Sequence, residues 1–219
     1  MNVDEQFEGL SPAHVSDALK QVRAGGGVVS GWVGRFAGVF VGVALPVQCV
    51  WEDYRAVDPA EYRTSEIESA VFAGAVVVID SGGRSDAVCG PVALAAYAVR
   101  GARAVVVNGG TRPPGAQDED AEPRLLTRHE VARSGFGSVR RELTDRVVID
   151  GVEIRRGDVM VGDRTAVVIV PAAVADTVAR QAAAVAAADE EILTGLRSGA
   201  SFGALWADSS RNINHVTKE

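Results

Sequence analysis

Two continuous apolar runs, joined by a helix of small residues, constrain the fold of this chain more than any other feature. The first run is Ala75–Asp80 and the second is Ala102–Val107. Between them lie a glycine turn at Ser81–Gly83 and a helical segment at Pro91–Arg100. Uninterrupted apolar runs are typical of strands buried on both faces. Strand, turn, helix and strand form a βαβ unit, so we expect two parallel neighbours in a buried sheet and an α/β fold.

Ahead of this unit the sequence predicts a helix, a strand and a second short helix. Ser11 is a good N-cap, and Pro12 suits the first position of the helix that follows. Phe36–Cys49 predicts a strand, in which Gly42 marks a point where another backbone could approach closely. Glu66–Phe72 is expected to form the second helix.

The second half of the chain carries β-type signals and a helical tail. Asp150-Gly151 is a strong hairpin signal between two short apolar segments. Four strands are expected, at Val147–Ile149, Val152–Ile154, Val159–Val161 and Ala166–Val170. Pro113–Pro123 predicts a solvated loop around the acidic run Asp118–Asp120, and the stretch from there to Arg146 stays ambiguous.

We expect one domain over residues 1–219, because no linker or repeat divides the chain. Its core spans about residues 10–171. One or two alanine-rich helices follow over 172–205, with breaks near Gly195 and Gly199. Residues 207–219 form a polar tail.

Charge and cysteine content narrow the functional classes. The 219 residues carry a formal net charge of −7, which argues against nucleic-acid binding because that function needs a basic surface. Cys49 and Cys89 lie in apolar segments without a CxxC pattern, so we expect buried thiols rather than a metal site. The sequence shows neither a signal peptide nor an apolar run of membrane-spanning length, so the expected location is the bacterial cytoplasm.

The βαβ unit also offers an anion-binding site. Gly90 and Pro91 begin the helix directly after a loop, which leaves the N–H groups of Val92 and Ala93 pointing out of the helix end. The positive end of the helix dipole favours a negative charge there. Because parallel strands place their carboxyl ends on one rim, Arg112 should lie on the same side and could bind a carboxylate. The alternative is that Arg112 is an ordinary surface or interface arginine.

Several motifs, in order and spacing, resemble those of the RraA-like family, typified by 4-hydroxy-4-methyl-2-oxoglutarate aldolase. Gly90 and Arg112 keep the family's spacing of 22 residues between a helix-start glycine and an arginine. The other matching segments are Val15–Leu19, Phe36–Ala44, Gly74–Asp80 and Gly151–Asp163. The resemblance covers about residues 10–205.

The resemblance implies a swivelling β/β/α sandwich, a homotrimer and a site between subunits. By this likeness, the backbone at Gly90, Pro91, Val92 and Ala93 would bind the carboxylate of a pyruvyl group, and Arg112 would bind the 2-oxo acid and stabilise its enolate. A glutamate from a neighbouring copy would complete the site, and Glu190 or Glu191 is the nearest match. The family norm is also a bound Mg²⁺ or Mn²⁺.

Two prolines depart from the family pattern. Pro113 stands where the metal-binding aspartate is expected, and Pro91 where a second acidic residue is common. Proline has no side-chain ligand atom, whereas a hard cation needs oxygen ligands, commonly carboxylates. We therefore expect no metal at this position, and the usual metal-assisted aldolase chemistry is in doubt.

Few side chains could supply replacement chemistry. His129, beside Arg128 and Glu130, could act as an acid or base, and Asn108 could hydrogen-bond a substrate at the strand end. Asp86 could face the site from the loop ahead of the helix. Each of the three also has a plain interpretation as a surface or turn residue. Four further residues are expected to be structural or solvated, namely His14, Trp51, Trp206 and His215.

Three functions fit these observations. The first is a divergent enzyme that acts on a carboxylated, 2-oxo acid type metabolite by lyase-type chemistry, without the usual metal and in a specialised bacterial pathway. The second is a non-catalytic binding or regulatory protein of the ribonuclease-inhibitor type. The third is a metal-dependent aldolase whose metal is held by Asp86 or by the acidic run at Asp118–Asp120.

Overall fold

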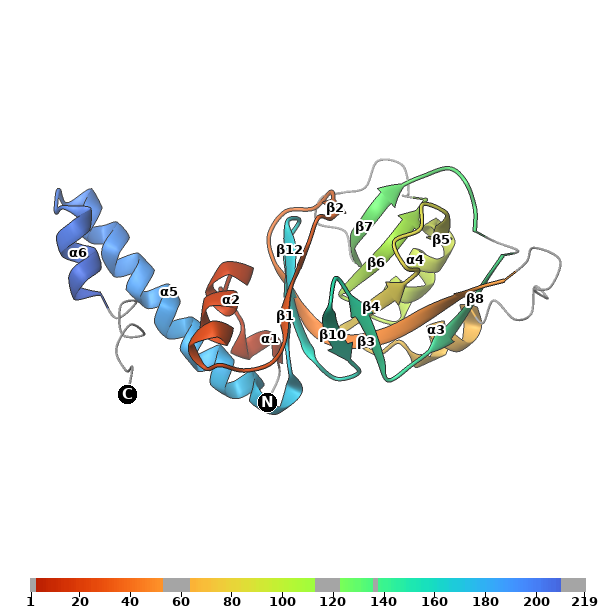
Figure 1. Ribbon diagram of the computed structural model, residues 1–219, viewed down its shortest axis with the longest axis horizontal. Helices are drawn as coiled ribbons and strands as arrows, with labels where there is room; N and C mark the ends of the chain where they lie inside the picture. The colour runs from red at the N-terminus through yellow and green to blue at the C-terminus, as the bar shows by residue number, and fades with distance from the viewer. Residues whose placement is uncertain (1–2, 53–63, 113–122, 136–137, 210–219) are drawn as a thin grey trace.

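The computed structural model describes residues 3–52, 64–112, 123–135 and 138–209. Two groups of helices enclose a layered β-structure between them (Figure 1). Pro113, the acidic run at 118–120, His215 and most of the predicted polar tail lie outside the described residues.

The helices and strands alternate through the first half of the chain, and strands then dominate up to the C-terminal helices. The helices are α1 (Val3–Gln6), α2 (Pro12–Gln21), α3 (Thr64–Ala70), α4 (Pro91–Val99), α5 (Ala175–Arg197) and α6 (Phe202–Asp208), with a 3₁₀ turn, η2, at Ala172–Val174. The first six strands are β1 (Gly27–Ser30), β2 (Val33–Gly34), β3 (Phe40–Trp51), β4 (Ala75–Asp80), β5 (Ala87–Cys89) and β6 (Ala104–Thr111). The others are β7 (Arg124–Glu130), β8 (Val139–Leu143), β9 (Arg146–Ile149), β10 (Val152–Arg155), β11 (Val159–Gly162) and β12 (Ala166–Val170).

Ten of the strands form one mixed sheet. Its order is β1-β12-β11-β3-β4-β6-β7-β2, with β5 added beside β6 and β8 beside β3, while β9 and β10 form a separate hairpin. β3, β4, β6 and β7 run parallel, with Val76 opposite Ala104 in the central pair. The predicted parallel βαβ unit is therefore confirmed.

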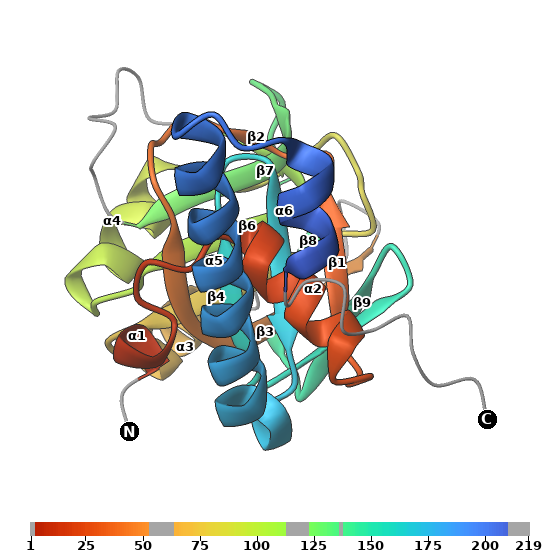
Figure 2. The same cartoon turned by 90° about the vertical axis from the view of Figure 1, so that its left-hand side faces the viewer.

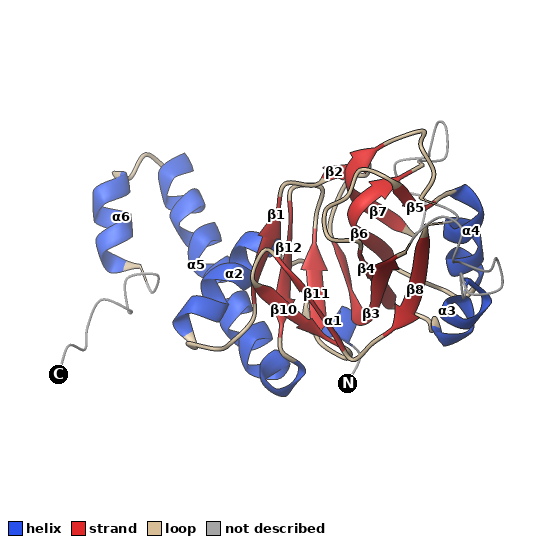
Figure 3. Ribbon diagram, turned by 45° about the vertical axis from the view of Figure 1, so that its right-hand side comes forward, coloured by secondary structure: helices blue, strands red, loops and turns tan. Residues whose placement is uncertain are grey.

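Three hydrophobic cores explain the uninterrupted apolar runs. In β4, Val77 and Ile79 face the core under α3 and α4, whereas Val76 and Val78 face a second core shared with β12 and the β9–β10 hairpin. In β12, the alternate residues enter a third core against α2 and α5. Figure 3 shows the resulting layers, with helices at both ends and strands between them. Because these strands are buried on both faces, nearly all of their positions are apolar, and Asp80 at the end of β4 is the exception in that strand.

Helix α2 begins as the sequence predicts. The Ser11 hydroxyl accepts a hydrogen bond from the His14 backbone N–H at 3.3 Å, and Pro12 follows at the first helical position. The His14 imidazole completes the cap by accepting from the Ser11 N–H at 3.3 Å. α2 then packs beside the first half of α5 (Figure 2).

The C-terminal helices form an arm that leaves the sheet layers (Figure 1). α5 runs through Gly195 without a break, and the missing side chain at that glycine lets Leu205 of α6 approach closely. The chain turns instead at Gly199, which has a φ of +92°. The sequence therefore located one of its two predicted helix breaks correctly, and the other glycine serves helix packing. None of the described helices has both the length and the hydropathy that a bilayer span requires.

Several boundaries differ from the sequence predictions. β3 begins at Phe40 rather than Phe36, after a turn at Gly38 with φ +75°. β6 continues through Asn108 to Thr111, since β5 and β7 pair with its end. The short β5 was not predicted because three residues are too few to show a pattern. The two strands of the ambiguous stretch, β7 and β8, were not predicted because their polar residues depend on neighbouring strands for burial. The Asp150-Gly151 hairpin is confirmed, and both residues have positive φ.

Gly42→Ala is expected to destabilise the fold. A Cβ atom at this position would lie 2.5 Å from the Gly74 carbonyl oxygen, which belongs to the backbone and cannot move aside cheaply. We expect a loss of about 1–3 kcal/mol in the free energy of unfolding, measured by urea denaturation at one fixed protein concentration. Gly203→Ala is the control, because a Cβ there meets nothing within 4 Å. Equal stability of the two variants would contradict this close approach.

The buried thiols predict a loss of stability at alkaline pH. Burial raises the pKa of Cys49 from 9.0 to about 12 and that of Cys89 from 9.0 to about 11, although the nearby Arg141 charge opposes both shifts. The unfolded chain therefore releases these protons first as the pH rises. Stability should be constant below about pH 9 with respect to these groups, and should fall as the pH rises toward 12.

Urea unfolding at successive pH values from 8 to 11 measures this effect. The doubly substituted Cys49→Ala, Cys89→Ala protein should lose less stability over the same pH range. Its remaining slope is expected from Tyr97, whose pKa burial also raises. Identical slopes in the wild-type and double-variant proteins would exclude the two thiols as the cause.

Candidate functional site

A cleft of about 450 Å³ lies where β5 leads into α4. One wall is the start of α4, and others come from the loop after β7, the end of β6 and the strand β8. The described lining residues are Ala87, Val88, Cys89, Gly90, Pro91, Val92, Ala93, Arg112, Ser134, Val139 and Arg141. Two of them are arginines and none is acidic, so the described lining of the cleft is positively charged.

The start of α4 presents unpaired backbone donors to this cleft. Gly90 is the N-cap, has extended backbone angles (φ −148°, ψ −178°) and provides no capping side chain. Pro91 follows at the first helical position, where its missing N–H costs no helical hydrogen bond. Val92 is 85% exposed. The amides of Val92 and Ala93 are thus available, with the helix dipole, to a negatively charged group.

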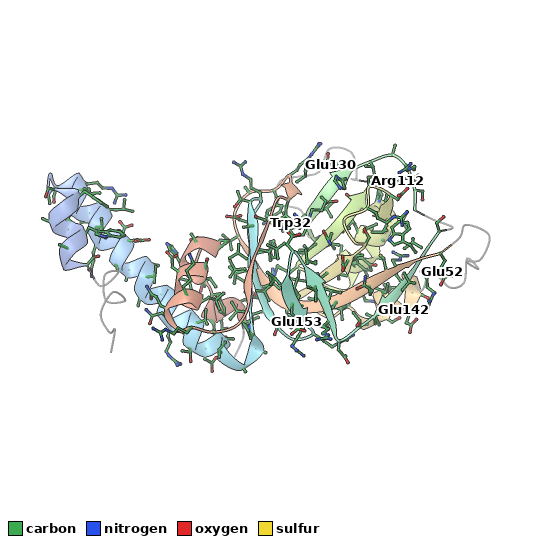
Figure 4. All side chains as sticks on the ribbon, viewed as in Figure 1. Trp32, Glu52, Arg112, Glu130, Glu142 and Glu153 are labelled. Atoms are coloured by element: carbon green, nitrogen blue, oxygen red, sulfur yellow. The ribbon has the colours of Figure 1, made fainter. Side chains whose placement is uncertain are left out.

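Arg112 lies beside this helix start, as the sequence predicts. Its backbone N–H donates to the Cys89 carbonyl at 3.0 Å, which joins the end of β6 to the residue before Gly90. Its Nε donates to the Ala132 carbonyl at 2.8 Å, and its side chain is otherwise exposed along the cleft. Figure 4 shows it beyond the end of β6. The structure therefore brings together the backbone and arginine that the sequence proposed as a carboxylate site.

Arg141 also lines the cleft, and the sequence analysis did not single it out. It lies on β8, is only 6% exposed and donates from Nη1 to the Val88 carbonyl at 3.1 Å. Its period-two pattern was the available signal, because Val139 and Arg141 share the buried face of the strand while Arg140 lies on the other face. That face could be identified only once β8 was known to pair with β3.

The described acidic residues around the cleft do not form a metal site. Asp86 precedes β5 but makes a salt bridge at 2.7 Å with the Arg133 Nε. Among the residues that the structure describes, no cluster of three or more His, Cys, Asp or Glu side chains could hold a metal ion. Among the described residues that line the cleft, none has a carboxylate that could bind a hard cation such as Mg²⁺.

Cys89 lines the cleft as a thiol. Burial raises its pKa to about 11, so the nucleophilic thiolate is scarce near neutral pH. We therefore assign it no covalent role.

Asn108 lies in a polar network beside the cleft rather than in its lining. Its Nδ2 donates to the Asp80 Oδ1 at 2.7 Å, and its Oδ1 accepts from the Arg128 Nε at 3.1 Å. Arg128 also stacks over the Trp32 ring at 4.0 Å and makes a salt bridge with Asp150. These contacts tie the ends of β4, β6 and β7 to the β9–β10 hairpin, which gives Asn108 a structural role in this chain.

The remaining predicted residues lie in two different places. The His129 Nε2 is 3.2 Å from the Gly83 carbonyl oxygen and is not among the residues that line the cleft. Glu130 contacts Arg35 on the same rim. Glu190 and Glu191 are exposed on the arm of α5, where Glu190 makes a 3.0 Å salt bridge with Arg197. Within one chain, the arm lies at the opposite end of the molecule from α4 (Figures 1 and 3).

The other residues singled out by sequence have packing partners. The His14 Nε2 lies 3.6 Å from an Asp189 oxygen, between α2 and α5. The Trp51 Nε1 donates to the Ser81 carbonyl at 3.1 Å, with the Arg84 guanidinium over its ring. Trp206 stacks on the Phe202 ring, 5.4 Å away, within α6.

Comparison with solved structures supports the fold. An uncharacterized protein from Pseudomonas syringae pv. tomato str. DC3000 is 26% identical, with a TM-score of 0.75 over 93% of this chain and 96% of that chain. Streptomyces coelicolor RraAS2, described as an unusual member of the RNase ES inhibitor RraA family, is 17% identical, with a TM-score of 0.71 over 90% and 96%. The RNA-processing inhibitor RraA from Thermus thermophilis is 19% identical, with a TM-score of 0.53 over 71% and 92%.

Comparison of the sequence with models of whole protein families identifies the family of this chain, whereas comparison with individual curated proteins does not. No curated protein matches the chain. A family model described as RraA-like, Aldolase/RraA, matches residues 12–169, which include β5, α4, Arg112 and Arg141. With the layered α/β fold and the structural neighbours in agreement, this match shows that the chain belongs to the RraA-like family.

Proposed function

We propose that this chain is a divergent cytoplasmic enzyme that binds a carboxylated metabolite of the 2-oxo acid type and performs lyase-type chemistry on it. One observation carries the proposal: the open start of α4 and the side chain of Arg112 line the same cleft. The family includes aldolases, which supports the reaction class. The reactions considered are C–C cleavage, decarboxylation and isomerisation through an enolate.

The carboxylate would bind between backbone and guanidinium. The N–H groups of Val92 and Ala93 would donate to one oxygen, and Arg112 would donate to the other. Hydrogen bonds to a charged group contribute roughly 1.5–3 kcal/mol each when they exchange with water. Since Pro91 cannot donate, recognition depends on the two following amides and on the arginine.

The same charges would serve the reaction. Cleavage of the C3–C4 bond releases a carbonyl compound or CO₂ and leaves its electron pair on C3, next to the 2-oxo group. That pair delocalises into the carbonyl, so negative charge develops on the oxo oxygen. Positively charged donors already in place favour this enolate-like state over the neutral oxo group. The role of Arg112 would thus be to orient the 2-oxo acid and stabilise the developing charge.

We propose that this member works without the Mg²⁺ or Mn²⁺ that its family uses. Pro113 has no ligand atom in its side chain, and Asp86 is engaged by Arg133. The described lining supplies cationic rather than anionic side chains. A divalent cation would be repelled by this lining, whereas an anionic substrate would be attracted.

The family likeness also supports a homotrimer in which Glu190 or Glu191 of a neighbouring copy reaches the cleft. Both residues are exposed on the projecting arm, which carries them away from the cleft of their own chain. An arrangement between copies is therefore the one in which either glutamate could act.

A second candidate function is that of a non-catalytic binding protein. The positively charged cleft without described carboxylate ligands favours it, because a binding protein needs no acid–base group or metal. Two structural neighbours are described as inhibitors of RNA processing or of RNase ES, which supports testing it.

Arg112→Ala should weaken the binding of pyruvate and oxalate by about 10- to 100-fold, because one charge-assisted contact of roughly 1.5–3 kcal/mol is removed. Isothermal titration calorimetry of the wild-type and variant proteins measures this change. Arg100→Ala is the matched control, since Arg100 lies at the opposite end of α4 and contacts Glu68 instead. Equal affinities in the wild-type protein and the Arg112→Ala variant would remove the cleft from the proposal.

Turnover separates the proposed enzyme from its alternatives. We expect pyruvate release from oxaloacetate or from 4-hydroxy-2-oxo acids to persist in EDTA and to be lost in the Arg112→Ala variant, as followed by a lactate dehydrogenase assay. Activity that appears only with added Mg²⁺ or Mn²⁺ would overturn the metal-free part of the proposal. If the acids bind but none is turned over, the binding-protein function is favoured.

A further inference from the structure

We infer that the junction of α2 and β1 is a binding site for a small phosphomonoester. The site is a cavity of about 360 Å³, lined by one side of α2 and by the glycine run Gly25–Gly27. α2 and α4 lie at opposite ends of the sheet layers (Figures 1 and 3). This cavity is therefore separate from the cleft at α4, and the inference does not depend on the proposed function.

α2 supplies three polar side chains to the cavity. Ser16, Lys20 and Arg23 follow one another at intervals of four and three residues, which places them along one side of the helix and its last turn. They carry a hydroxyl, an ammonium and a guanidinium group. Among the described residues that line the cavity, none is acidic. The cavity thus presents positive charge and hydrogen-bond donors to a ligand.

The two cations of the cavity differ from other basic residues of this acidic chain, whose formal net charge is −7. Arg35, Arg100 and Arg133 each pair with a carboxylate. Lys20 and Arg23 are exposed, and neither makes a salt bridge within the part of the chain that the structure describes. Two positive charges at one cavity repel each other, whereas an anion bound between them is attracted to both.

The backbone of Arg23 has a conformation that favours glycine. Its N–H donates to the Lys20 carbonyl at 3.2 Å, and the Ala24 N–H donates to the Leu19 carbonyl at 3.2 Å, which is the pattern of a Schellman helix end. The residue at this position is usually glycine because φ is positive, and φ of Arg23 is +50°. An arginine here costs conformational energy that glycine would not, so the position keeps a positive charge against the preference of its backbone.

The glycine run forms a wall of the cavity that is fixed against neighbouring strands. Gly26 has a φ of +102°, and a Cβ atom there would lie 2.2 Å from the Ile169 carbonyl oxygen of β12. A Cβ atom at Gly27 would lie 2.8 Å from the Val152 side chain of β10. Close packing therefore requires glycine at both positions. A wall without side chains also lets the oxygens of a ligand approach the main chain.

A phosphate group matches these donors better than a carboxylate does. A phosphomonoester carries a charge of about −1.5 to −2 at pH 7 and three oxygens that accept hydrogen bonds. Lysine binds phosphate as a point charge, and arginine binds it through a planar fork of donors. The Ser16 hydroxyl is a third donor. Leu19 and Val28 add apolar surface to the cavity, which suits a small organic group attached to the phosphate.

Calorimetric titration of the whole protein with glycerol 3-phosphate, inorganic phosphate and glycerol tests the inference. Sodium chloride keeps the ionic strength equal in all three titrations, because salt screens exposed charges. Glycerol 3-phosphate should bind at least about tenfold more tightly than glycerol, which lacks the charged group. Inorganic phosphate should bind more weakly than the ester, since it makes no contact with the apolar surface. Equal affinity for the ester and inorganic phosphate would overturn the assignment of a phosphomonoester.

Arg23→Gly should weaken the binding of glycerol 3-phosphate by at least about fivefold, because it removes one of the two charges. Glycine is favoured at this φ, so the variant should melt at or above the wild-type temperature, and unfolding would not explain its loss of binding. Lys20→Met should weaken binding to a similar extent. Arg100→Ala is the matched control, because it removes one positive charge from the C-terminal end of another helix, α4, and should keep the wild-type affinity.

Arg112→Ala separates the cavity from the cleft. This variant should bind glycerol 3-phosphate as the wild type does, and Arg23→Gly should leave the binding of oxalate unchanged. Loss of phosphoester binding in Arg112→Ala but not in Arg23→Gly would place the phosphate in the cleft and overturn the inference. No binding by the wild-type protein, or equal weakening by Arg23→Gly and Arg100→Ala, would also overturn it, and neither result bears on the carboxylate site.

Discussion

Burial of the central strands on both faces is the constraint on which the rest of the structure depends. β4 and β6 contribute alternate side chains to two separate cores, so layers must cover each side of the sheet. α3 and α4 cover one side, and β12 with the β9–β10 hairpin covers the other. This arrangement directs the carboxyl ends of the parallel strands to one rim, where β6 ends at Thr111 and Arg112 follows. The cleft is a consequence of that rim.

The three-residue strand β5 connects the end of β6 to the start of α4 and so forms part of the cleft. It pairs with the end of β6 and leads directly into the N-cap of α4. Its consecutive carbonyls hold the Arg141 side chain and the Arg112 backbone, so the position of both cations relative to the helix start is set by backbone hydrogen bonds. Groups that are held by hydrogen bonds before a ligand arrives lose less entropy when it binds.

The rim carries two different sets of polar groups, a hydrogen-bonded network that joins strands and a positively charged cleft beside it. Asn108 bonds to both Asp80 and Arg128, and these contacts join β4, β6 and β7. The cleft, in contrast, combines an apolar surface with two guanidinium groups and helix amides. Its described residues suit an anion and do not suit a hard cation. The chain thus combines the fold of its family with a cleft whose described residues carry positive charge.

The sequence alone determined the βαβ unit, the capped start of α2, the Asp150-Gly151 hairpin and the meeting of Arg112 with the start of α4. Each of these follows from local chemistry: apolar runs, a capping hydroxyl, a turn that needs positive φ, and the parallel alignment of neighbouring strands. Only the tertiary structure decided what the side chains of Asn108 and Arg141 contact. The contacts of these two polar residues depend on which strand lies beside them. The polar segments that form β7 and β8 show no periodicity strong enough to predict that pairing. In the antiparallel register of β3 and β8, Arg141 lies opposite Cys49, and this register places its guanidinium in the cleft. The sequence of β8 alone does not reveal the register.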